Sequence, residues 1–428
     1  MKIQLKGLQP FSGKLTIPPS KSQTMRAFIF ALLAEGESTI FNPLISPDTL
    51  AMLEAIESLG AKRMFQSPQK ITLLGTGGQL KAPTKTIDAH NSGLILRLIG
   101  ALLGYLKTPA VITGDLSIQK NRSVAPLISG LKQLGAQVTG LGKDPRPPLL
   151  IQGPIHPGKM SIFGEDSQPV SAFLIALAFL NGPSEILVKK PKEKPWIDLT
   201  LSWLDFFQIP YERKGYAYYK LFGGGKIRGF EYRVPADFSS LSYPAALALL
   251  TGGHLLIEGL SFQDRQGDKL FLHLLQKMGA DLLLNEEKGA LEIRPTSRLK
   301  ALEIDAGDLI DAVPLLALIA TFAKGTTCIY NAQNARIKES DRLKTITLEL
   351  RKMGARIEEK QGSLVIFSSP LHEARLFSHL DHRIALSLIV AGLSVKGVSV
   401  LENAECLKKS YPNFLEELKN HNQNIKIL

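Results

Sequence analysis

Basic side chains recur beside the starts of predicted helices, where proteins often bind anions. One phrase is Pro19-Ser20-Lys21-Ser22 followed by Arg26, another is Asn91-Ser92-Gly93 followed by Arg97, and Asp381-His382-Arg383 opens a third helix. Ser, Asn and Asp are ordinary N-caps. A cation in the first turn, however, opposes the helix dipole and costs about 0.3–1 kcal/mol. A bound anion would offset this cost, because the free N–H groups and the cation would both point at it.

Further basic phrases lie at Lys120-Asn121-Arg122, Arg336 to Arg342 and Lys408-Lys409. A charged run is most often a solvated helix face. Taken with the helix starts, these phrases instead indicate basic groups gathered around more than one phosphate or carboxylate. Planar Arg forks suit carboxylate and phosphate, and Lys offers a point charge or a proton.

Two carboxylates lie among the basic phrases, Glu339 beside Lys338 and Asp311 before Ala312-Val313-Pro314. Local sequence at Asp311 fits an ordinary helix cap. Capping alone explains Asp237 at its helix start.

No cofactor motif accompanies these residues. The sequence lacks G-x-x-x-x-G-K-[ST], and it lacks G-x-G-x-x-G after a strand. No His/Cys/acid cluster has metal-ligand spacing. We therefore expect no cofactor and no metal.

The composition is that of a globular protein. The chain has 428 residues, 44% of them hydrophobic, and a formal net charge of +12. Cys328 and Cys406 are far apart, the first residues lack a signal peptide's apolar run, and no apolar stretch is long enough to span a bilayer. We expect a cytoplasmic protein with no membrane partner.

The elements that position these residues repeat along the chain. Turns after apolar helical segments recur every 71 to 75 residues, at Gly36, Lys107, Gly182, Gly253, Gly325 and Gly397. A second helix ends in a Gly-Ala phrase at residues 60, 135, 279 and 354, where glycine reads as an αL cap. The third and sixth repeats lack this phrase.

The first helix of each repeat is apolar nearly all round, which predicts burial at a domain centre. These helices are expected at Ala27 to Leu33, Leu94 to Leu103, Ala172 to Phe179, Pro244 to Leu250, Val313 to Ala323 and Ile384 to Gly392. Strands are expected at Ser38 to Phe41, Thr326 to Tyr330 and Leu364 to Phe367. The sequence predicts an α/β protein with three repeats in each of two domains.

The ordered phrases resemble the signatures of one family, the EPSP synthases. They are Pro19 to Ser22 with Arg26, Asn91 to Gly93 with Arg97, R-x-K-E-[ST]-D-R at Arg336 to Arg342, and D-H-R at Asp381 to Arg383. The resemblance implies a two-domain inside-out α/β barrel of six βαβαββ-type repeats. Domain I would comprise residues 1–18 plus 235–428, with the N-terminal strand in the C-terminal half, and domain II residues 19–234.

The resemblance also implies an activity in the shikimate pathway of aromatic amino acid biosynthesis. The enolpyruvyl group of phosphoenolpyruvate would pass to the 5-hydroxyl of shikimate 3-phosphate. The implied catalytic residues are Lys21, Asp311 and Glu339. The implied shikimate 3-phosphate ligands are Lys21, Ser22, Arg26, Ser167, Gln168, Asp311, Asn334 and Lys338. Those for phosphoenolpyruvate are Lys21, Gly93, Arg122, Gln168, Arg342, Arg383 and Lys409. We expect a monomer that binds only these small anions.

Several residues depart from the family pattern. Asp166 and Glu193 stand where serines are usual, and Trp196 replaces a tyrosine. Asp166 would repel a phosphate unless it turns away to cap its helix. Leu94 and Leu98 are bulkier than usual behind Gly93, from which we expect altered affinity for glyphosate, the inhibitor that mimics phosphoenolpyruvate.

Three other functions remain possible from the sequence. The sister enzyme that acts on UDP-N-acetylglucosamine shares the chemistry, but its loop cysteine has no match here. A basic nucleic-acid-binding repeat protein would fit the charge, but aromatics are only 7% and few lie near the basic phrases. A catalytically inactive relative conflicts with the intact Lys21, Asp311 and Glu339.

Overall fold

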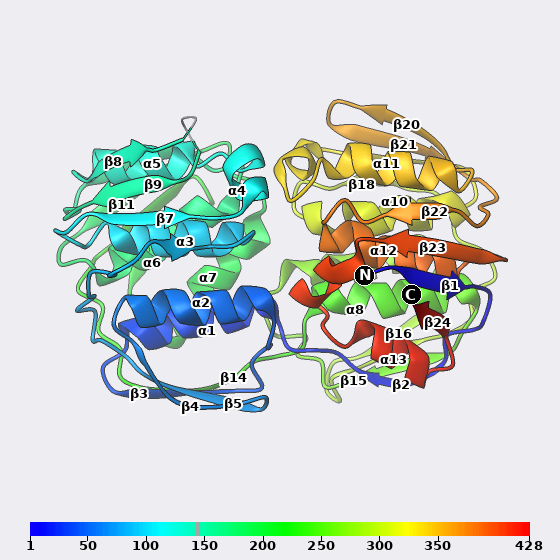
Figure 1. The fold of residues 1–428 in the computed structure, drawn as a ribbon, viewed down its shortest axis with the longest axis horizontal. Coiled ribbons are helices and arrows are strands. Elements are labelled where there is room, and N and C mark those ends of the chain that lie inside the picture. The colour runs from blue at the N-terminus through cyan, green and yellow to red at the C-terminus, as the bar shows by residue number, and fades with distance from the viewer. Residues whose placement is uncertain (143–145) are drawn as a thin grey trace. The chain divides into compact units, whose positions relative to one another are not determined.

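The computed structural model describes residues 1–142 and 146–428. Its contacts divide the chain into two compact units, unit 1 (Met1–Pro18 and Pro235–Leu428) and unit 2 (Pro19–Val234). Each unit contains three four-stranded sheets, whose strands can be followed in Figure 1. The α/β class and the arrangement of six repeats, three to each half of the fold, are confirmed.

Every sheet has the same pattern, in which one parallel pair is extended by two antiparallel strands. In unit 2 the strand orders are β6-β7-β9-β8, β10-β11-β13-β12 and β14-β3-β5-β4. Their bounds are β3 Glu37–Phe41, β4 Lys62–Ser67, β5 Lys70–Leu74, β6 Ile87–Asp88, β7 Ala110–Thr113, β8 Gln137–Gly140, β9 Leu149–Gln152, β10 Lys159–Phe163, β11 Ser184–Lys189, β12 Tyr211–Lys214, β13 Tyr218–Leu221 and β14 Glu231–Arg233.

In unit 1 the orders are β16-β17-β15-β2, β18-β19-β21-β20 and β22-β23-β1-β24. Their bounds are β1 Ile3–Lys6, β2 Gly13–Thr16, β15 Leu255–Glu258, β16 Leu282–Asn285, β17 Ala290–Ile293, β18 Glu303–Asp305, β19 Thr326–Tyr330, β20 Arg356–Lys360, β21 Ser363–Phe367, β22 Arg375–Phe377, β23 Val398–Glu402 and β24 Asn424–Ile427.

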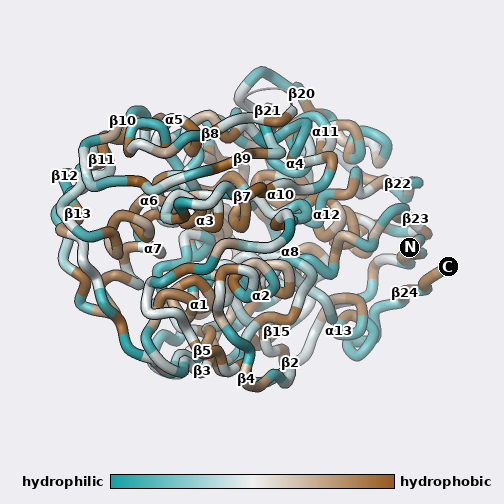
Figure 2. Tube along the Cα trace, turned by 60° about the vertical axis from the view of Figure 1, so that its left-hand side comes forward, coloured by the Kyte–Doolittle hydropathy of each residue, from teal (hydrophilic) through white to brown (hydrophobic). Residues whose placement is uncertain are grey.

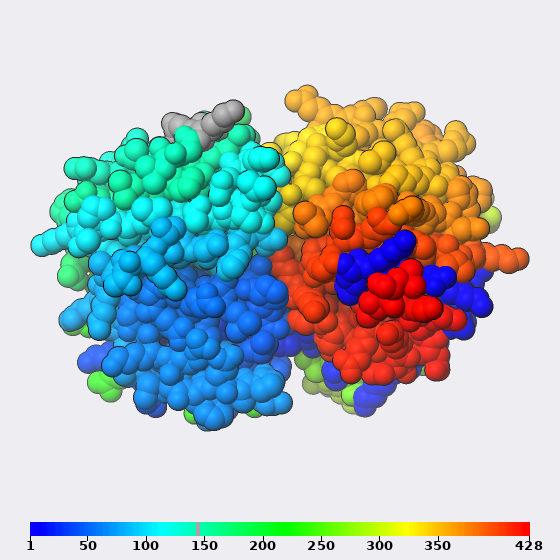
Figure 3. All heavy atoms as spheres, viewed as in Figure 1, coloured from blue at the N-terminus to red at the C-terminus, as the bar shows by residue number. Residues whose placement is uncertain are grey.

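The N-terminal strand joins the C-terminal half, as predicted. Strand β1 lies between β23 and β24 and is antiparallel to both. In Figure 3 the dark blue N-terminal residues accordingly lie among the red C-terminal ones. Strand β2 pairs with β15, and at the other end of unit 2 β14 pairs with β3. The chain therefore enters and leaves unit 2 through sheets that combine strands far apart in sequence.

The first helix of each repeat is buried along nearly its whole length, as its apolar sequence predicts. These helices are α1 Lys21–Leu33, α3 Gly93–Leu103 and α6 Ser167–Phe179 in unit 2, and α8 Phe238–Thr251, α10 Val313–Phe322 and α12 His382–Leu393 in unit 1. Their hydrophobic stretches appear brown in Figure 2. Each unit has one hydrophobic core built around its three helices. Their N-termini carry the polar phrases.

The second helices are α2 Pro47–Ser58, α5 Ala125–Gln133, α7 Lys194–Phe206, α9 Leu270–Lys277, α11 Arg342–Lys352 and α13 Phe414–Asn420. The predicted αL caps are present at residues 60, 135, 279 and 354 with φ between +92° and +109°. The two repeats without glycine keep the cap, because Gln208 and Asn422 adopt φ of 55° and 60°. The N–H of the residue after each cap then donates to a carbonyl in the last turn of the helix, from Ile209 to Leu204 and from Gln423 to Leu418. The geometry is therefore repeated six times even where its sequence signal is lost.

A short helix, α4 (Leu116–Asn121), precedes α5. The described part of the chain also contains four 3-10 helices: η1 Gly267–Lys269, η2 Ile310–Ala312, η3 Gln333–Ile337 and η4 Ala404–Lys409. Within the described residues, no helix combines the length and apolar character needed to cross a membrane.

Candidate active site

Arg342 is the centre of a cluster of charged side chains in unit 1. It begins α11, is 1% exposed, and donates to three carboxylates. The N–O distances are 2.6 Å to Asp311, 2.7 Å to Glu339 and 2.8 Å to Asp381. Lys409, at the end of η4, donates to the other oxygen of Glu339, Oε1, at 2.8 Å. The charged run at 336–342 is therefore mostly not a solvated helix face, since Lys338, Ser340 and Arg342 are buried.

Asp311 is not a helix cap. It lies in η2, and the N-cap of α10 is Ala312, which makes no side-chain cap bond. The carboxylate instead accepts hydrogen bonds from Arg342 at 2.6 Å and Arg383 at 3.3 Å. Desolvation by burial would raise the pKa of Asp311, but the charges of Arg342, Arg383 and Lys338 outweigh it, so the pKa lies well below its usual value.

Arg383 reaches the same cluster from the start of α12. Asp381 caps this helix by accepting the Arg383 N–H at 2.9 Å, and its other oxygen binds Arg342 and Ser340. Asp381 is fully buried, which a carboxylate tolerates only when paired. One carboxylate thus orients both arginines. The cluster brings together five predicted residues, namely Asp311, Glu339, Arg342, Arg383 and Lys409.

Asn334 and Lys338 lie at the edge of this cluster. Both are nearly buried, with Asn334 in η3 and Lys338 at its C-cap. Segment η3 contacts η2, which carries Asp311, and the charge of Lys338 acts on Asp311. The structure places both residues near the carboxylate that they were predicted to accompany.

Asp268 and Tyr243 belong to the same neighbourhood and carry no sequence signal. Burial raises the pKa of Asp268 to about 7 against the attraction of Arg383. Burial likewise raises the pKa of Tyr243 to about 12. The phrase Gln266-Gly267-Asp268-Lys269 reads as an ordinary turn, so only the packing of η1 against α8 reveals this acid.

Glu339, Asp381 and His382 present ligand atoms within 4.8 Å of one another, the spacing of a metal site. Arg342 donates to both carboxylates, and Lys409 donates to Glu339. These cations already supply the positive charge that a metal would bring. The arrangement favours binding of an anion over binding of a metal at this point.

In unit 2, three predicted residues converge on the start of α3. A Cβ added to Gly93 would lie 2.9 Å from Arg97 Nη1, 2.9 Å from Gln168 Oε1 and 3.3 Å from Arg122 Nη1. Only glycine allows this close approach. Among the described residues Gln168 Oε1 has no hydrogen-bond partner, although it is buried. The group of Gly93, Arg122 and Gln168 can therefore receive a polar ligand.

Lys21 and Arg26 lie on α1 and are held by other elements of unit 2. Lys21 is 3.2 Å from Asp48, a buried acid in the first turn of α2. Arg26 donates to the Thr200 hydroxyl at 2.9 Å and to the Trp196 carbonyl at 3.2 Å, both on α7. It also donates to the carbonyl of Ser22 at 3.3 Å. Sequence reasoning missed Asp48, which reads as an ordinary first-turn acid of a capped helix.

Two carboxylates lie at the start of α6, Asp166 as its N-cap and Glu193 from the N-cap of α7. Asp166 caps the helix by accepting the Gln168 N–H at 3.0 Å, and it lies 3.1 Å from Arg97. Glu193 accepts from both the N–H and the hydroxyl of Ser167, at 3.3 and 3.0 Å. Asp166 therefore caps its helix, which is the arrangement we expected if this carboxylate is not to repel a phosphate. Ser167, predicted to bind a phosphate, is held by Glu193.

The helix-start cations do not depend on a ligand to offset the helix dipole. Lys21, Arg97 and Arg383 are each paired with a carboxylate of the chain, at distances between 3.1 and 3.3 Å. We expected a bound anion to offset this cost, but carboxylates of the chain already do so at these three residues. A sequence does not show which acids fold back onto a helix start. A ligand anion must share or replace these partners.

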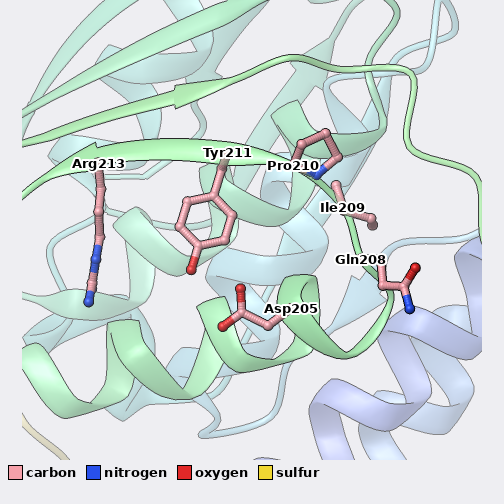
Figure 4. Close-up of a pocket in the computed structure, with 6 residues that line it drawn as sticks. All are labelled: Asp205, Gln208, Ile209, Pro210, Tyr211 and Arg213. Atoms are coloured by element: carbon pink, nitrogen blue, oxygen red, sulfur yellow. The ribbon is translucent and has the colours of Figure 1, made fainter.

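Figure 4 shows a pocket in unit 2 between the end of α7 and the start of β12. It is lined by Asp205, Gln208, Ile209, Pro210, Tyr211 and Arg213, and none of these is a predicted site residue. Burial and a hydrogen bond to Asp205 raise the pKa of Tyr211 to about 12, which makes the phenol a poor proton donor near neutral pH.

The chain is similar over nearly its full length to proteins of one family. The family described as EPSP synthase (3-phosphoshikimate 1-carboxyvinyltransferase) matches residues 5–418. The chain is 40% identical over 416 residues to a Chlamydia felis protein named 3-phosphoshikimate 1-carboxyvinyltransferase, covering 97% of this chain and 92% of that one. A Chlamydia muridarum protein of the same name is 39% identical over 422 residues, covering 97% and 93%.

Solved structures agree. The EPSP synthase of Acinetobacter baumannii superposes with a TM-score of 0.83 at 28% identity, covering 99% of both chains. An enolpyruvyl transferase of Streptomyces tendae reaches 0.81 at 18% identity, covering 99% of this chain and 98% of its own, and shows the fold alone. The match over nearly the full length, with the ordered signatures, shows that the chain belongs to the EPSP synthase family.

Proposed function

We propose that the chain transfers the enolpyruvyl group of phosphoenolpyruvate to the 5-hydroxyl of shikimate 3-phosphate. The products are 5-enolpyruvylshikimate 3-phosphate and inorganic phosphate. The hydroxyl oxygen adds to C2 of phosphoenolpyruvate while C3 gains a proton. Phosphate then leaves C2 as C3 loses a proton. Each step needs charge stabilisation and proton transfer.

The observation that carries the proposal is the binding of Arg342 to Asp311, Glu339 and Asp381 together. The cluster places two half-buried or buried carboxylates, Asp311 and Glu339, on one guanidinium with Arg383 and Lys409 beside them. Such a site combines acids and bases for proton transfer with fixed cations for a phosphate and a carboxylate.

Asp311 is assigned the hydroxyl proton, and Glu339 with Lys21 the proton at C3. In the state described, the two arginines keep Asp311 ionised but lower its pKa, which makes it a weak base. An anion bound at Arg342 and Arg383 would draw their charge away and raise the basicity of Asp311. Binding of phosphoenolpyruvate would thus prepare the base for the acceptor.

The remaining predicted residues are assigned to binding. Arg342, Arg383 and Lys409 in unit 1, with Gly93, Arg122 and Gln168 in unit 2, are proposed for phosphoenolpyruvate. Ser22, Arg26 and Ser167, with Asn334 and Lys338, are proposed for shikimate 3-phosphate. The close approach around Gly93 and the buried Gln168 oxygen without a partner among the described residues support the first set.

The test is Glu339→Gln, which keeps the shape but removes the titrating group. Phosphate release from phosphoenolpyruvate and shikimate 3-phosphate should fall by about 10²–10⁴-fold in kcat. The matched control is Glu358→Gln, an exposed residue of β20 in the same unit, which should keep full activity. Full activity in Glu339→Gln would remove Glu339 from the mechanism.

We also propose that the protein acts as a monomer in the cytoplasm, in the shikimate pathway. Cys328 and Cys406 are both free thiols, which suits a reducing compartment. Size-exclusion chromatography with light scattering should give the mass of one chain, 46.8 kDa. A dimer mass would correct this assignment without affecting the chemistry.

A further inference from the structure

The chain enters α12 through a tight turn whose residues are poorly suited to it. His379 and Leu380 both adopt a positive φ, of 53° and 58°, and the Asp381 N–H donates to the Ser378 carbonyl at 3.1 Å. Positive φ at both central residues is the pattern of a type I′ turn, which Gly, Asn and Asp normally form. Because neither His nor Leu favours this backbone, contacts outside the turn must impose it.

A buried carboxylate holds the start of this turn. Glu349, on α11, is fully buried, and its Oε1 lies 2.8 Å from His379 Nε2. Its Oε2 accepts the N–H of Phe377, the last residue of β22, at 3.0 Å, and Lys352 donates to both oxygens. Desolvation by burial would raise the pKa of Glu349, but these hydrogen bonds outweigh it and hold the pKa below its usual value. The His379 ring therefore binds an ionised carboxylate with several fixed partners.

The end of the same turn is held by the arginine at the centre of the proposed active site. Asp381 is fully buried. Its Oδ2 accepts from Arg342 Nε at 2.8 Å, and its Oδ1 accepts the Arg383 N–H at 2.9 Å. Arg342 and Glu349 lie on α11 at positions i and i+7, which project from nearly the same face, about 10 Å apart along the helix axis. One face of α11 therefore holds both ends of the turn.

Of the two central residues, His379 is the one whose side chain can bind α11. Leu380 is 65% exposed and has no polar side-chain atom. Ser378 makes a second tie, because its hydroxyl accepts the Leu380 N–H at 3.1 Å and donates to the Asn403 carbonyl at 2.6 Å. That tie fastens the turn to the residues after β23. Loss of the His379 ring would thus remove the contact between the strained part of the turn and the helix that carries Arg342.

We propose that His379 is a positioning residue for the binding of phosphoenolpyruvate. Its bond to Glu349 keeps the turn in the positive-φ conformation that sets Asp381. Asp381 in turn orients Arg342 and the start of α12, which carries Arg383. His379 acts through these residues and is not itself a ligand. This inference rests on the proposed function, which assigns both arginines to phosphoenolpyruvate.

The direct test is the kinetics of His379→Leu, which removes the ring but leaves Glu349 paired with Lys352 and the Phe377 N–H. The KM for phosphoenolpyruvate should rise about tenfold, because small displacements of positioned groups are costly. The KM for shikimate 3-phosphate and the kcat should change much less. Lower stability with both KM values unchanged would show a merely structural role and overturn the inference. His379→Ala gives the same test if the first variant does not fold.

The matched control is His254→Leu. His254 also pairs with a glutamate of unit 1, since its Nε2 lies 2.8 Å from Glu292 Oε1 on β17. This pair lies at the surface, with the His254 side chain 57% exposed. The control should keep the wild-type KM for both substrates. An equal rise in the KM for phosphoenolpyruvate in both variants would contradict a specific role for His379.

A double variant separates positioning from any direct action of the ring. Asn-Gly is the sequence that forms a type I′ turn most readily. His379→Asn combined with Leu380→Gly should therefore form the turn from local preference, although the amide is too short to replace the ring at Glu349. The KM for phosphoenolpyruvate should return close to the wild-type value. A KM that stays as high as in His379→Leu would show that the turn is not the route by which His379 acts.

Two further measurements distinguish failure of this inference from failure of the proposed function. Absence of turnover by the wild type with shikimate 3-phosphate would overturn the proposed function and remove the basis of the inference. Normal wild-type turnover with an unchanged KM for phosphoenolpyruvate in His379→Leu would overturn the inference alone. The strain in the turn is tested without turnover by urea unfolding of Leu380→Gly, whose midpoint should rise because glycine adopts positive φ freely. An unchanged or lower midpoint would contradict the strain on which the inference depends.

Discussion

Arg342 Nη1 lies 2.6 Å from Asp311 Oδ1, although Asp311 precedes a helix that it does not cap. Arg342 is 1% exposed, whereas the Asp311 side chain is 29% exposed. The arginine is thus a fixed part of the interior, and the carboxylate keeps part of its surface exposed. This ion pair connects residues 31 positions apart at the centre of the proposed active site in unit 1.

Removing the Asp311 charge should abolish most of the activity. Asp311→Asn keeps the size of the side chain but cannot accept the hydroxyl proton, so kcat should fall by about 10²–10⁴-fold. Initial rates of phosphate release measure this effect. Asp305→Asn, at an exposed acid in the same unit, is the control and should retain wild-type rates. Equal rates for both variants would show that Asp311 is not the base.

Asp268 should make stability depend on pH between about 4 and 7. Burial raises its pKa to about 7 in the folded protein, whereas an unfolded Asp titrates near 3.9. The folded state therefore holds the proton longer, and its stabilising contribution is complete below pH 4 and is lost as pH rises to 7. Urea unfolding of Asp268→Asn should lack this loss, which amounts to about 1.4 kcal/mol per pH unit.

The comparison with wild type must be made at several pH values, because the substitution itself changes packing by a constant amount. Stability differences that are the same at pH 5, 6 and 7 would show that Asp268 does not hold a proton in this range.

The end of α5 tests the repeated helix cap. Gly135 has φ of +99°, and an added Cβ would lie 3.2 Å from the His156 ring. Gly135→Ala should lower the free energy of unfolding by about 1–2 kcal/mol, since side chains disfavour the left-handed region. Gly158→Ala in the same unit is the control, because its Cβ would meet nothing within 4 Å. Equal urea midpoints for the two variants would reject the strain argument.

Leu94 should influence inhibition by glyphosate. It follows Gly93 at the start of α3 and is half-buried, whereas Leu98 lies fully in the core. Leu94→Thr should therefore change the inhibition constant of glyphosate by more than it changes the KM for phosphoenolpyruvate. An unchanged inhibition constant would show that the bulk behind Gly93 does not set inhibitor affinity.

The sequence predicted the repeated elements well because their signals are local. The six apolar helices, the β19 and β21 strands and the αL caps at the Gly-Ala phrases follow from hydropathy and glycine alone. The caps at Gln208 and Asn422 were not predictable, since other residues adopt this conformation when packing requires it. Local sequence could not decide between a cap and an ion-pair partner for Asp311.

The partners of the site residues were the least predictable part. Lys21 and Arg97 were identified from their places at helix starts, but their partners were not. Asp48 approaches Lys21 from α2, and Asp166 pairs with Arg97 from the N-cap of α6. Glu193 was seen only as a departure from a pattern, and Asp268 was not seen. These pairings depend on how helices pack within a unit, which spacing along the chain does not encode.

The most direct test of the central claim is phosphate release by the purified wild-type protein with phosphoenolpyruvate and a chosen acceptor. Shikimate 3-phosphate and UDP-N-acetylglucosamine would be supplied in separate reactions without added metal. We predict release that depends on shikimate 3-phosphate and does not occur with the nucleotide sugar. Release with the nucleotide sugar alone, or with neither acceptor, would contradict the proposed activity.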